Sequence, residues 1–91
     1  AYFTYSGTGD LRFYIKNTSK KTVYYKVQYP SGYYLLGSSS SGNALDPGEH
    51  FQATFNVYDV YGPGSWGKYT VYVYNDDGSE GSFHVSARTL E

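Results

Sequence analysis

Apolar and polar side chains alternate along most of this chain with a period of two residues. In residues 11–16, Leu11, Phe13 and Ile15 fall on one face and Arg12 and Lys16 on the other. This period is typical of a half-buried β-strand, and no stretch keeps the 3.6-residue period of an amphipathic helix. The pattern, with the turn residues between runs, predicts seven short strands, at residues 2–5, 11–16, 22–29, 33–36, 50–57, 67–75 and 82–87.

The clearest predicted unit is a β-hairpin near the C-terminus. Residues 67–75 alternate strongly, with Tyr69, Val71 and Val73 on one face, and residues 82–87 form the return run. Between them, Asp77-Gly78 is a strong turn signal because glycine accepts positive φ without steric cost. We therefore expect these two runs to pair with each other.

Each predicted strand has one apolar face, and only a sandwich or barrel buries all of them. Ninety-one residues make one domain with a modest core. We expect that domain to span residues 1–89 and residues 90–91 to be a cloning remnant. The expected core consists of Phe13, Ile15, Val23, Tyr25, Val27, Phe51, Phe55, Val71, Val73, Phe83 and Val85.

Four turn motifs suggest a family. They are Asn-Thr-Ser at 17–19, Tyr-Pro-Ser-Gly at 29–32, Leu-Asp-Pro-Gly-Glu at 45–49 and Gly-Lys-Tyr-Thr-Val at 67–71. In this outline the chain resembles bacterial immunoglobulin-like domains of the adhesion and proteinase-inhibitor types, over roughly residues 11–88. The resemblance implies an all-β, immunoglobulin-like two-sheet antiparallel sandwich of about seven strands.

The resemblance also makes a local prediction. Tyr69 matches the tyrosine-corner position, where the hydroxyl bonds to backbone upstream. The disulfide and buried tryptophan of antibody domains are absent, since the chain has no cysteine and Trp66 precedes the strand. No catalytic or inhibitory residue of the family carries over.

Tyrosine is the unusual component, with 13 residues in the chain. An immunoglobulin-like order would put residues 22–29, 68–75 and 80–87 in one sheet. Three interpretations of its outer face remain open: cross-strand packing without a ligand, contact with a protein, or stacking on a glycan. The candidate binding residues on this face are Tyr24, Lys26, Tyr72, Tyr74 and His84.

A second aromatic cluster lies in the irregular connection at residues 58–66. Its candidate binding residues are Tyr58, Tyr61 and Trp66. Loops at the ends of sandwiches often carry binding sites. The alternative is that this segment only closes the end of the core.

Catalytic and metal chemistry find little support in the sequence. There is no cysteine or methionine, and the two histidines, His50 and His84, lie in no nucleophile motif. Two distant histidines make a poor zinc site. The acidic turn at residues 75–80 offers oxygen atoms but not the spacing of a calcium loop. We expect no enzyme activity, no metal and no cofactor.

Charge and composition bear on partners and compartment. The net charge of −1 provides no field to recruit nucleic acid, and no run is long enough to span a membrane. The lack of cysteine, the Ala1 start and the sparse charge favour an extracytoplasmic product. We expect a secreted or cell-surface, non-enzymatic binding or accessory module, monomeric, with a protein or glycan partner. The alternatives are an inhibitor or toxin-like protein docking through an end loop, and a carbohydrate-binding module using exposed tyrosines.

Overall fold

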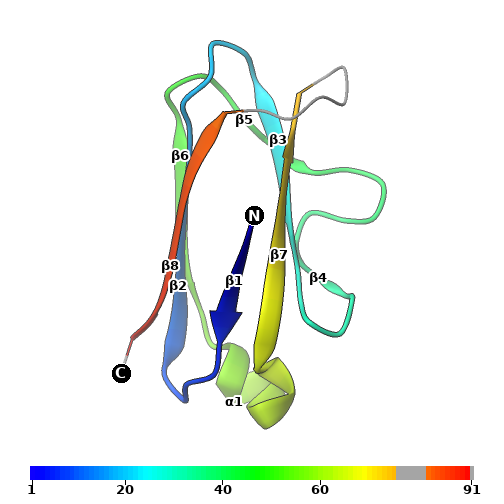
Figure 1. The fold of residues 1–91 in the computed structure, drawn as a ribbon, viewed down its shortest axis with the longest axis vertical. Coiled ribbons are helices and arrows are strands. Elements are labelled where there is room, and N and C mark those ends of the chain that lie inside the picture. The colour runs from blue at the N-terminus through cyan, green and yellow to red at the C-terminus, as the bar shows by residue number, and fades with distance from the viewer. Residues whose placement is uncertain (76–81, 91) are drawn as a thin grey trace.

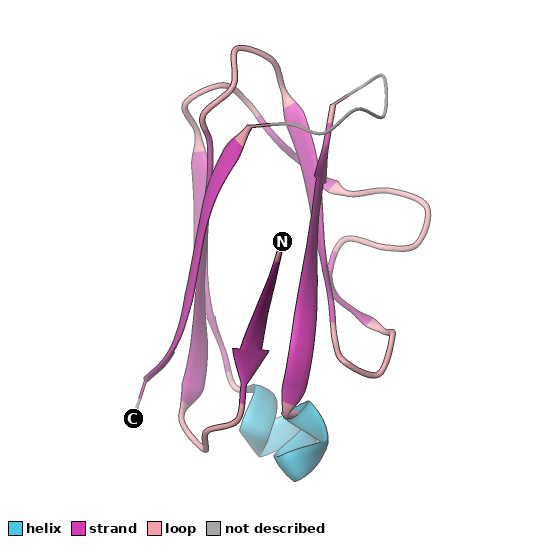
Figure 2. Cartoon of the chain, in the orientation of Figure 1, coloured by secondary structure: helices cyan, strands magenta, loops and turns pink. Residues whose placement is uncertain are grey.

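A computed structural model describes residues 1–75 and 82–90 of the chain. Two antiparallel sheets face each other (Figures 1 and 2), which confirms the all-β two-sheet sandwich. The described part has eight strands where the sequence predicted seven. They are β1 (Tyr2–Tyr5), β2 (Asp10–Asn17), β3 (Val23–Gln28), β4 (Tyr34–Leu36), β5 (Asn43–Leu45), β6 (His50–Phe55), β7 (Gly67–Tyr74) and β8 (Phe83–Leu90).

The larger sheet has the strand order β1-β7-β3-β4, and β5 also pairs with β3. β4 and β5 share one edge of β3, because β4 pairs with residues 27–28 and β5 with residues 23–25. The three residues of β5 are too few to show alternation, which explains why the sequence pattern missed this strand. β4 lies at the sheet edge.

The smaller sheet has the order β6-β2-β8. β2 lies in its centre and pairs along its whole length with β8, from Asp10 opposite Leu90 to Asn17 opposite Phe83. Leu90 is therefore part of a strand, and the fold extends past residue 89. Glu91 and the turn residues 76–81 lie outside the described residues.

The expected hairpin of β7 with β8 is wrong. β7 pairs with β1 and β3 in the larger sheet, whereas β8 pairs with β2 in the smaller one. The edge of β7 that a hairpin partner needs is taken by the N-terminus. There the Val71 amide donates to the Ala1 carbonyl at 2.8 Å, and the Ala1 amino group donates to the Val71 carbonyl at 3.2 Å.

The core lies between the sheets and largely follows the prediction. Seven of the expected residues are buried: Phe13, Ile15, Val23, Tyr25, Val27, Val71 and Val73. The other four, Phe51, Phe55, Phe83 and Val85, are only partly buried and pack against that core. All four belong to β6 and β8, the edge strands of the smaller sheet, where neighbours cover less of each side chain.

Two short helices close one end of the sandwich (Figure 1). They are α1 (Val57–Tyr61) and the 3₁₀-helix η1 (Gly62–Ser65), within the segment expected to be irregular. A single helical turn is too short to show a 3.6-residue period. Val57 was expected to end a strand. Instead β6 ends at Phe55, and Val57 is buried as the first residue of α1.

The predicted hydrogen bond of Tyr69 is confirmed. Its hydroxyl donates to the Ser65 carbonyl at 2.7 Å, and the Tyr69 side chain is fully buried. This bond joins the start of β7 to the end of η1. It therefore fixes where the helical segment sits over the end of the core.

Asn17 performs a similar task at the other end of the sandwich. Its side-chain amide donates to the carbonyls of Lys21 and Leu45, both at 2.8 Å. Its Oδ1 atom accepts a bond from the Ser19 amide at 2.8 Å. A buried amide with these partners is satisfied, and it ties the turn after β2 to the end of β5.

Candidate binding site

The turn after β3 positions two tyrosines at the helical end of the sandwich. Tyr29 follows β3 directly, and Pro30 cannot extend the hydrogen-bonded ladder. The Tyr29 amide donates to the Tyr33 carbonyl at 2.7 Å, and the Gly32 amide donates to the Tyr29 carbonyl at 3.0 Å. Gly32 has a φ of 101°, which favours glycine. The turn thus brings Tyr29 and Tyr33 to the same end.

The helical segment contributes a third tyrosine. Tyr61 ends α1, and Gly62 follows with a φ of 55° and its amide bonded to the Tyr58 carbonyl. The buried Ser65 hydroxyl donates to the Gly62 carbonyl at 2.6 Å. These bonds hold the backbone around Tyr61, so the position of its ring is set by the end of the helix.

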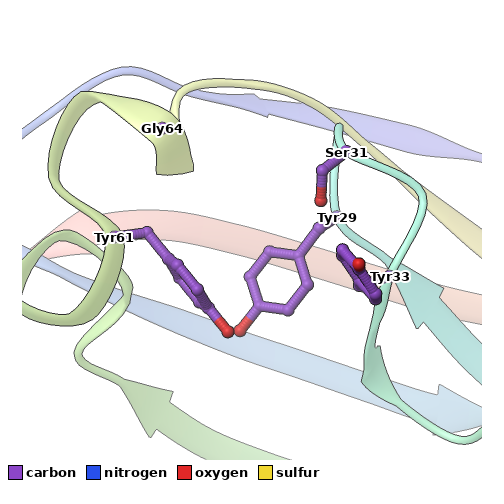
Figure 3. A pocket seen from close by; sticks show the side chains of 5 residues that line it. All are labelled: Tyr29, Ser31, Tyr33, Tyr61 and Gly64. Carbon is purple, nitrogen blue, oxygen red and sulfur yellow. The ribbon is translucent and has the colours of Figure 1, made fainter.

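Tyr29, Tyr33 and Tyr61 line a hollow of about 230 Å³, together with Ser31 and Gly64 (Figure 3). In Figure 3 the rings of Tyr29 and Tyr61 converge at their hydroxyl ends, and Tyr33 lies beyond Tyr29. The Tyr33 side chain is 78% exposed and that of Tyr61 is 56% exposed. The rings of Tyr33 and Tyr61 therefore form two walls of the hollow, and a ligand can reach both of them.

Tyr29 anchors this hollow to the core. Its ring meets Tyr61 edge-on at 5.3 Å between centroids and lies 5.5 Å from the buried Tyr69 ring. Burial, and then the neighbouring Tyr61, raise the pKa of Tyr29 above its usual value. The hollow presents hydroxyl groups and apolar ring surface.

A second hollow of about 170 Å³ adjoins the first and shares Tyr29 and Tyr61 with it. The other residues that line it are apolar except for one amide: Leu35, Phe55, Asn56, Val57 and Val60. The two hollows together make an aromatic and aliphatic depression across the end of the sandwich. Such a site suits an apolar group with few hydrogen bonds to direct it.

The candidate strand face is assembled as predicted for four of its five residues. In the register of β3 and β7, Tyr24 lies opposite Tyr74 and Lys26 opposite Tyr72. All four side chains are on the outer face of the larger sheet, and Tyr72 is 42% exposed.

These side chains mainly contact one another. The Tyr24 and Tyr74 rings stack at 5.7 Å, and the Lys26 ammonium lies over the Tyr72 ring at 5.6 Å. The Tyr74 hydroxyl accepts a bond from the Gly42 amide at 2.8 Å, which holds the loop before β5. Lys26 covers one face of Tyr72, so this face of the sheet offers less open ring surface than the end hollow.

His84 does not belong to that face. It lies on β8 in the smaller sheet, opposite Lys16, and its ring meets Tyr14 edge-on at 6.2 Å. The expectation failed because an immunoglobulin-like order would put residues 80–87 in one sheet with residues 22–29 and 68–75, whereas β8 pairs with β2 in the smaller sheet.

The three candidate binding residues of the segment 58–66 do not lie at one site. Tyr61 lines the hollow, whereas Tyr58 and Trp66 stack on each other at 6.1 Å and line neither of the two hollows. The Trp66 indole donates to the Gly7 carbonyl at 2.9 Å, although its side chain is 42% exposed. This pair ties the helical segment to the loop between β1 and β2, which is the closing role considered for the segment.

The sequence pattern missed three residues of the hollow: Tyr29, Ser31 and Tyr33. Tyr29 ends the strand predicted at residues 22–29, and the Tyr-Pro-Ser-Gly motif at 29–32 predicts only a turn. A signal was present, since aromatic residues flank the Pro-Ser-Gly turn on both sides. What the pattern could not show is that this turn lies beside Tyr61.

Neither a candidate metal site nor a membrane-spanning helix is found among the described residues. Residues 1–75 and 82–90 contain no group of three or more side chains of the metal-binding types. Within the same residues, no helix is long and apolar enough to cross a bilayer. Most of the acidic turn at residues 75–80 lies outside this part of the chain, so the expectation that it binds no calcium stays a prediction.

No protein-family model, no curated protein and no solved structure matches this chain. Function must therefore be argued from the site itself.

Proposed function

We propose that this chain is a non-enzymatic binding module of the secreted or cell-surface type, with the hollow between Tyr29, Tyr33 and Tyr61 as its contact site. The observation that carries the proposal is the exposure of Tyr33 and Tyr61 around a preformed hollow of about 230 Å³. Tyrosine combines a large rigid ring with one hydroxyl and is enriched where proteins contact partners.

The partner that fits best is a protein or peptide that inserts an apolar side chain. The walls are ring and aliphatic surface, and no charged residue among residues 1–75 and 82–90 lines either hollow. A glycan ring needs several directed hydrogen bonds, and the first hollow supplies only hydroxyl groups and backbone for them. The proposal joins two of the expected functions, because the site combines a turn with the end loop that an inhibitor-like protein would use.

An immunoglobulin-like relationship and an extracytoplasmic location are part of the same proposal. The tyrosine corner at Tyr69 supports the first. The strand order departs from the immunoglobulin-like order, because β8 lies in the smaller sheet and β1 takes its place beside β7. The absence of cysteine and a surface built from tyrosine, serine, threonine and glycine support the second.

A displayed library of random peptides tests the binding site. We expect selection on the folded domain to enrich peptides that share one aromatic or aliphatic anchor residue. Affinity for these peptides should fall at least about tenfold, or about 1.4 kcal/mol, in a Tyr33→Ser/Tyr61→Ser variant. Both side chains are exposed, so the double variant should remain folded.

Tyr72→Ser is the matched control, since it removes an exposed tyrosine from the strand face. It should leave the affinity unchanged. A loss of affinity in Tyr72→Ser alone would indicate that the site is on the strand face. An equal loss of affinity in both variants would contradict a site at the hollow. A glycan array run with the same proteins would overturn the protein-partner proposal if it gave the only specific binding and the Tyr33→Ser/Tyr61→Ser variant lost it.

A further inference from the structure

The outer face of the smaller sheet gathers positive charge. Arg12 and Lys16 of β2 and Arg88 of β8 point away from the core on this face, and they are three of the seven Lys and Arg residues in a chain of net charge −1. His50 of β6 and His84 of β8 lie on the same face. We call these five residues the cationic face.

Strand register sets two arginines directly opposite each other and places a histidine on either side of the lysine. Arg12 lies opposite Arg88, and Lys16 lies opposite both His50 and His84. Like charges directly opposite on adjacent antiparallel strands destabilise a sheet. The opposed pair of Arg12 and Arg88 does not stabilise the fold, so this arrangement is a candidate for a functional role.

Few acidic groups are placed to neutralise it. Asp10 shares the face but lies at its end, opposite Leu90. Glu49 precedes His50, and its Oε1 atom accepts a bond from the Asp46 amide at 2.7 Å. Asp46 in turn accepts a bond from the Thr22 hydroxyl at 2.9 Å. The acidic residues at positions 76, 77 and 80 lie outside the described residues.

The shape and chemistry of the face favour one class of ligand. Four residues of extended strand separate Arg12 from Lys16 by about 13 Å, and the three strands span about 10 Å. Gln52, Thr54 and Ser86 lie between the charges and offer amide and hydroxyl groups. The apolar groups here are Tyr14, whose ring stacks on His50 at 5.6 Å, and Leu90 at the end.

We propose that the cationic face binds a linear acidic polysaccharide, independently of the tyrosine hollow. Carboxylates along the polymer pair with Arg12 and Arg88 at one end of the face and with Lys16 at the other. Arginine suits this because its planar guanidinium holds a carboxylate through two parallel hydrogen bonds. The polar side chains between the charges accept and donate hydrogen bonds to sugar hydroxyls. Complexes with peptides usually depend on an apolar anchor residue. The cationic face offers little apolar surface to receive one, so a polysaccharide fits it better than an acidic peptide.

The two histidines of the face lie beside its single lysine. His50 and His84 flank Lys16, with Tyr14 packed against both and Glu49 next to His50 along the chain. Uronate carboxylates are ionised at neutral pH, since ordinary carboxyl groups titrate near pH 4.

The test measures binding of the folded domain to polygalacturonate at low salt, with dextran as the neutral polymer. We expect saturable binding to polygalacturonate alone, and this binding should weaken steeply as salt screens the charges. An Arg12→Gln/Arg88→Gln variant should bind at least about tenfold more weakly. It should melt no lower than wild type, because the substitution removes a like-charge pair.

Lys26→Gln/Lys68→Gln is the matched control, since it removes the same charge from the larger sheet. It should bind within about twofold of wild type. Equal loss in both double variants would show attraction by net charge alone and would overturn the proposal. Binding of single-stranded DNA or polyglutamate as tight as that of polygalacturonate would also overturn it.

Discussion

Tyr69 shows how much one side chain can organise in a small domain. Its ring stacks on Phe3 at 5.1 Å and lies against Tyr29 and Tyr5. Its hydroxyl reaches the Ser65 carbonyl in the buried end of η1. One residue therefore connects β1, β7, the turn that carries the hollow, and the helical segment. The hollow is preformed because its base, Tyr29, rests on this buried ring.

Stability at alkaline pH should depend on Tyr69. Burial, with smaller contributions from Tyr29, Tyr5 and Tyr61, raises its pKa to about 12. In the unfolded chain a tyrosine ionises near pH 10. The unfolded state therefore loses its proton first, so Tyr69 favours folding fully below pH 10 and less as the pH rises towards 12. Urea unfolding at pH 7, 10 and 11.5 measures this loss.

Tyr69→Phe should cost about 1 kcal/mol at pH 7, because the buried Ser65 carbonyl loses its donor. The same variant should lose less stability than wild type between pH 10 and 11.5. Tyr72→Phe, at an exposed position, serves as the control and should follow the wild-type slope. Identical slopes for all three proteins would contradict the assignment to Tyr69.

At the scale of a strand, β7 alternates between buried side chains and side chains that face solvent. Tyr69, Val71 and Val73 are buried, whereas Lys68 and Tyr72 are exposed. β7 also lies between β1 and β3, so both of its backbone edges are paired. Substitutions on its two faces should therefore differ strongly in effect.

Val73→Asp should unfold the domain at room temperature, because it places an unpaired carboxylate in the core. Thr70→Asp, on the other face, should change the free energy of unfolding by only about 0.5 kcal/mol. Circular dichroism with thermal melting distinguishes the two. Equal melting temperatures would mean that the faces of β7 are assigned wrongly.

At the scale of the whole molecule, β1 closes the larger sheet. It covers the edge of β7 from Tyr2 opposite Thr70 to Tyr5 opposite Gly67. Tyr5 is buried, and its hydroxyl donates to the Gly9 carbonyl. Gly67 has a φ of 136° and lies against Pro30, where an added Cβ would approach ring carbons at 2.9 Å. The start of β7 is thus packed on both sides, by β1 and by the turn that carries the hollow.

Removal of residues 1–5 should expose the edge of β7 and cause association between copies, because an unpaired strand edge is a template for pairing. We expect a lower melting temperature and a larger species in size-exclusion chromatography. A synthetic peptide of residues 1–6 should restore the monomer by occupying the same edge. Tyr2→Ala, at an exposed position, is the control and should melt close to wild type.

A truncated chain that stays monomeric and melts like wild type would show that β1 is dispensable. Association that the peptide does not reverse would point instead to exposed core residues such as Tyr69.

The sequence by itself determined which side of each strand faces the core. Alternation placed Phe13, Ile15, Val71 and Val73 on the inner sides of their strands, and Tyr24, Lys26, Tyr72 and Tyr74 on the outer sides of theirs. These are local properties, because successive side chains of an extended strand point in opposite directions whatever lies next to it. Turn chemistry was equally local, as the φ of 80° at Gly48 in the predicted Pro-Gly turn shows.

Only the tertiary structure decided which strands pair. A strand with one apolar face fits either sheet of a sandwich, so the pattern could not tell that β8 leaves β7 for β2, or that β1 takes its place. Both candidate sites depend on that choice. The hollow joins a turn and a helix that are distant in sequence, and the cationic face exists because β8 brings Arg88 beside Arg12. The alternation in the sequence indicates which side chains are buried. Strand pairing instead depends on how all the strand edges of the complete chain compete for partners.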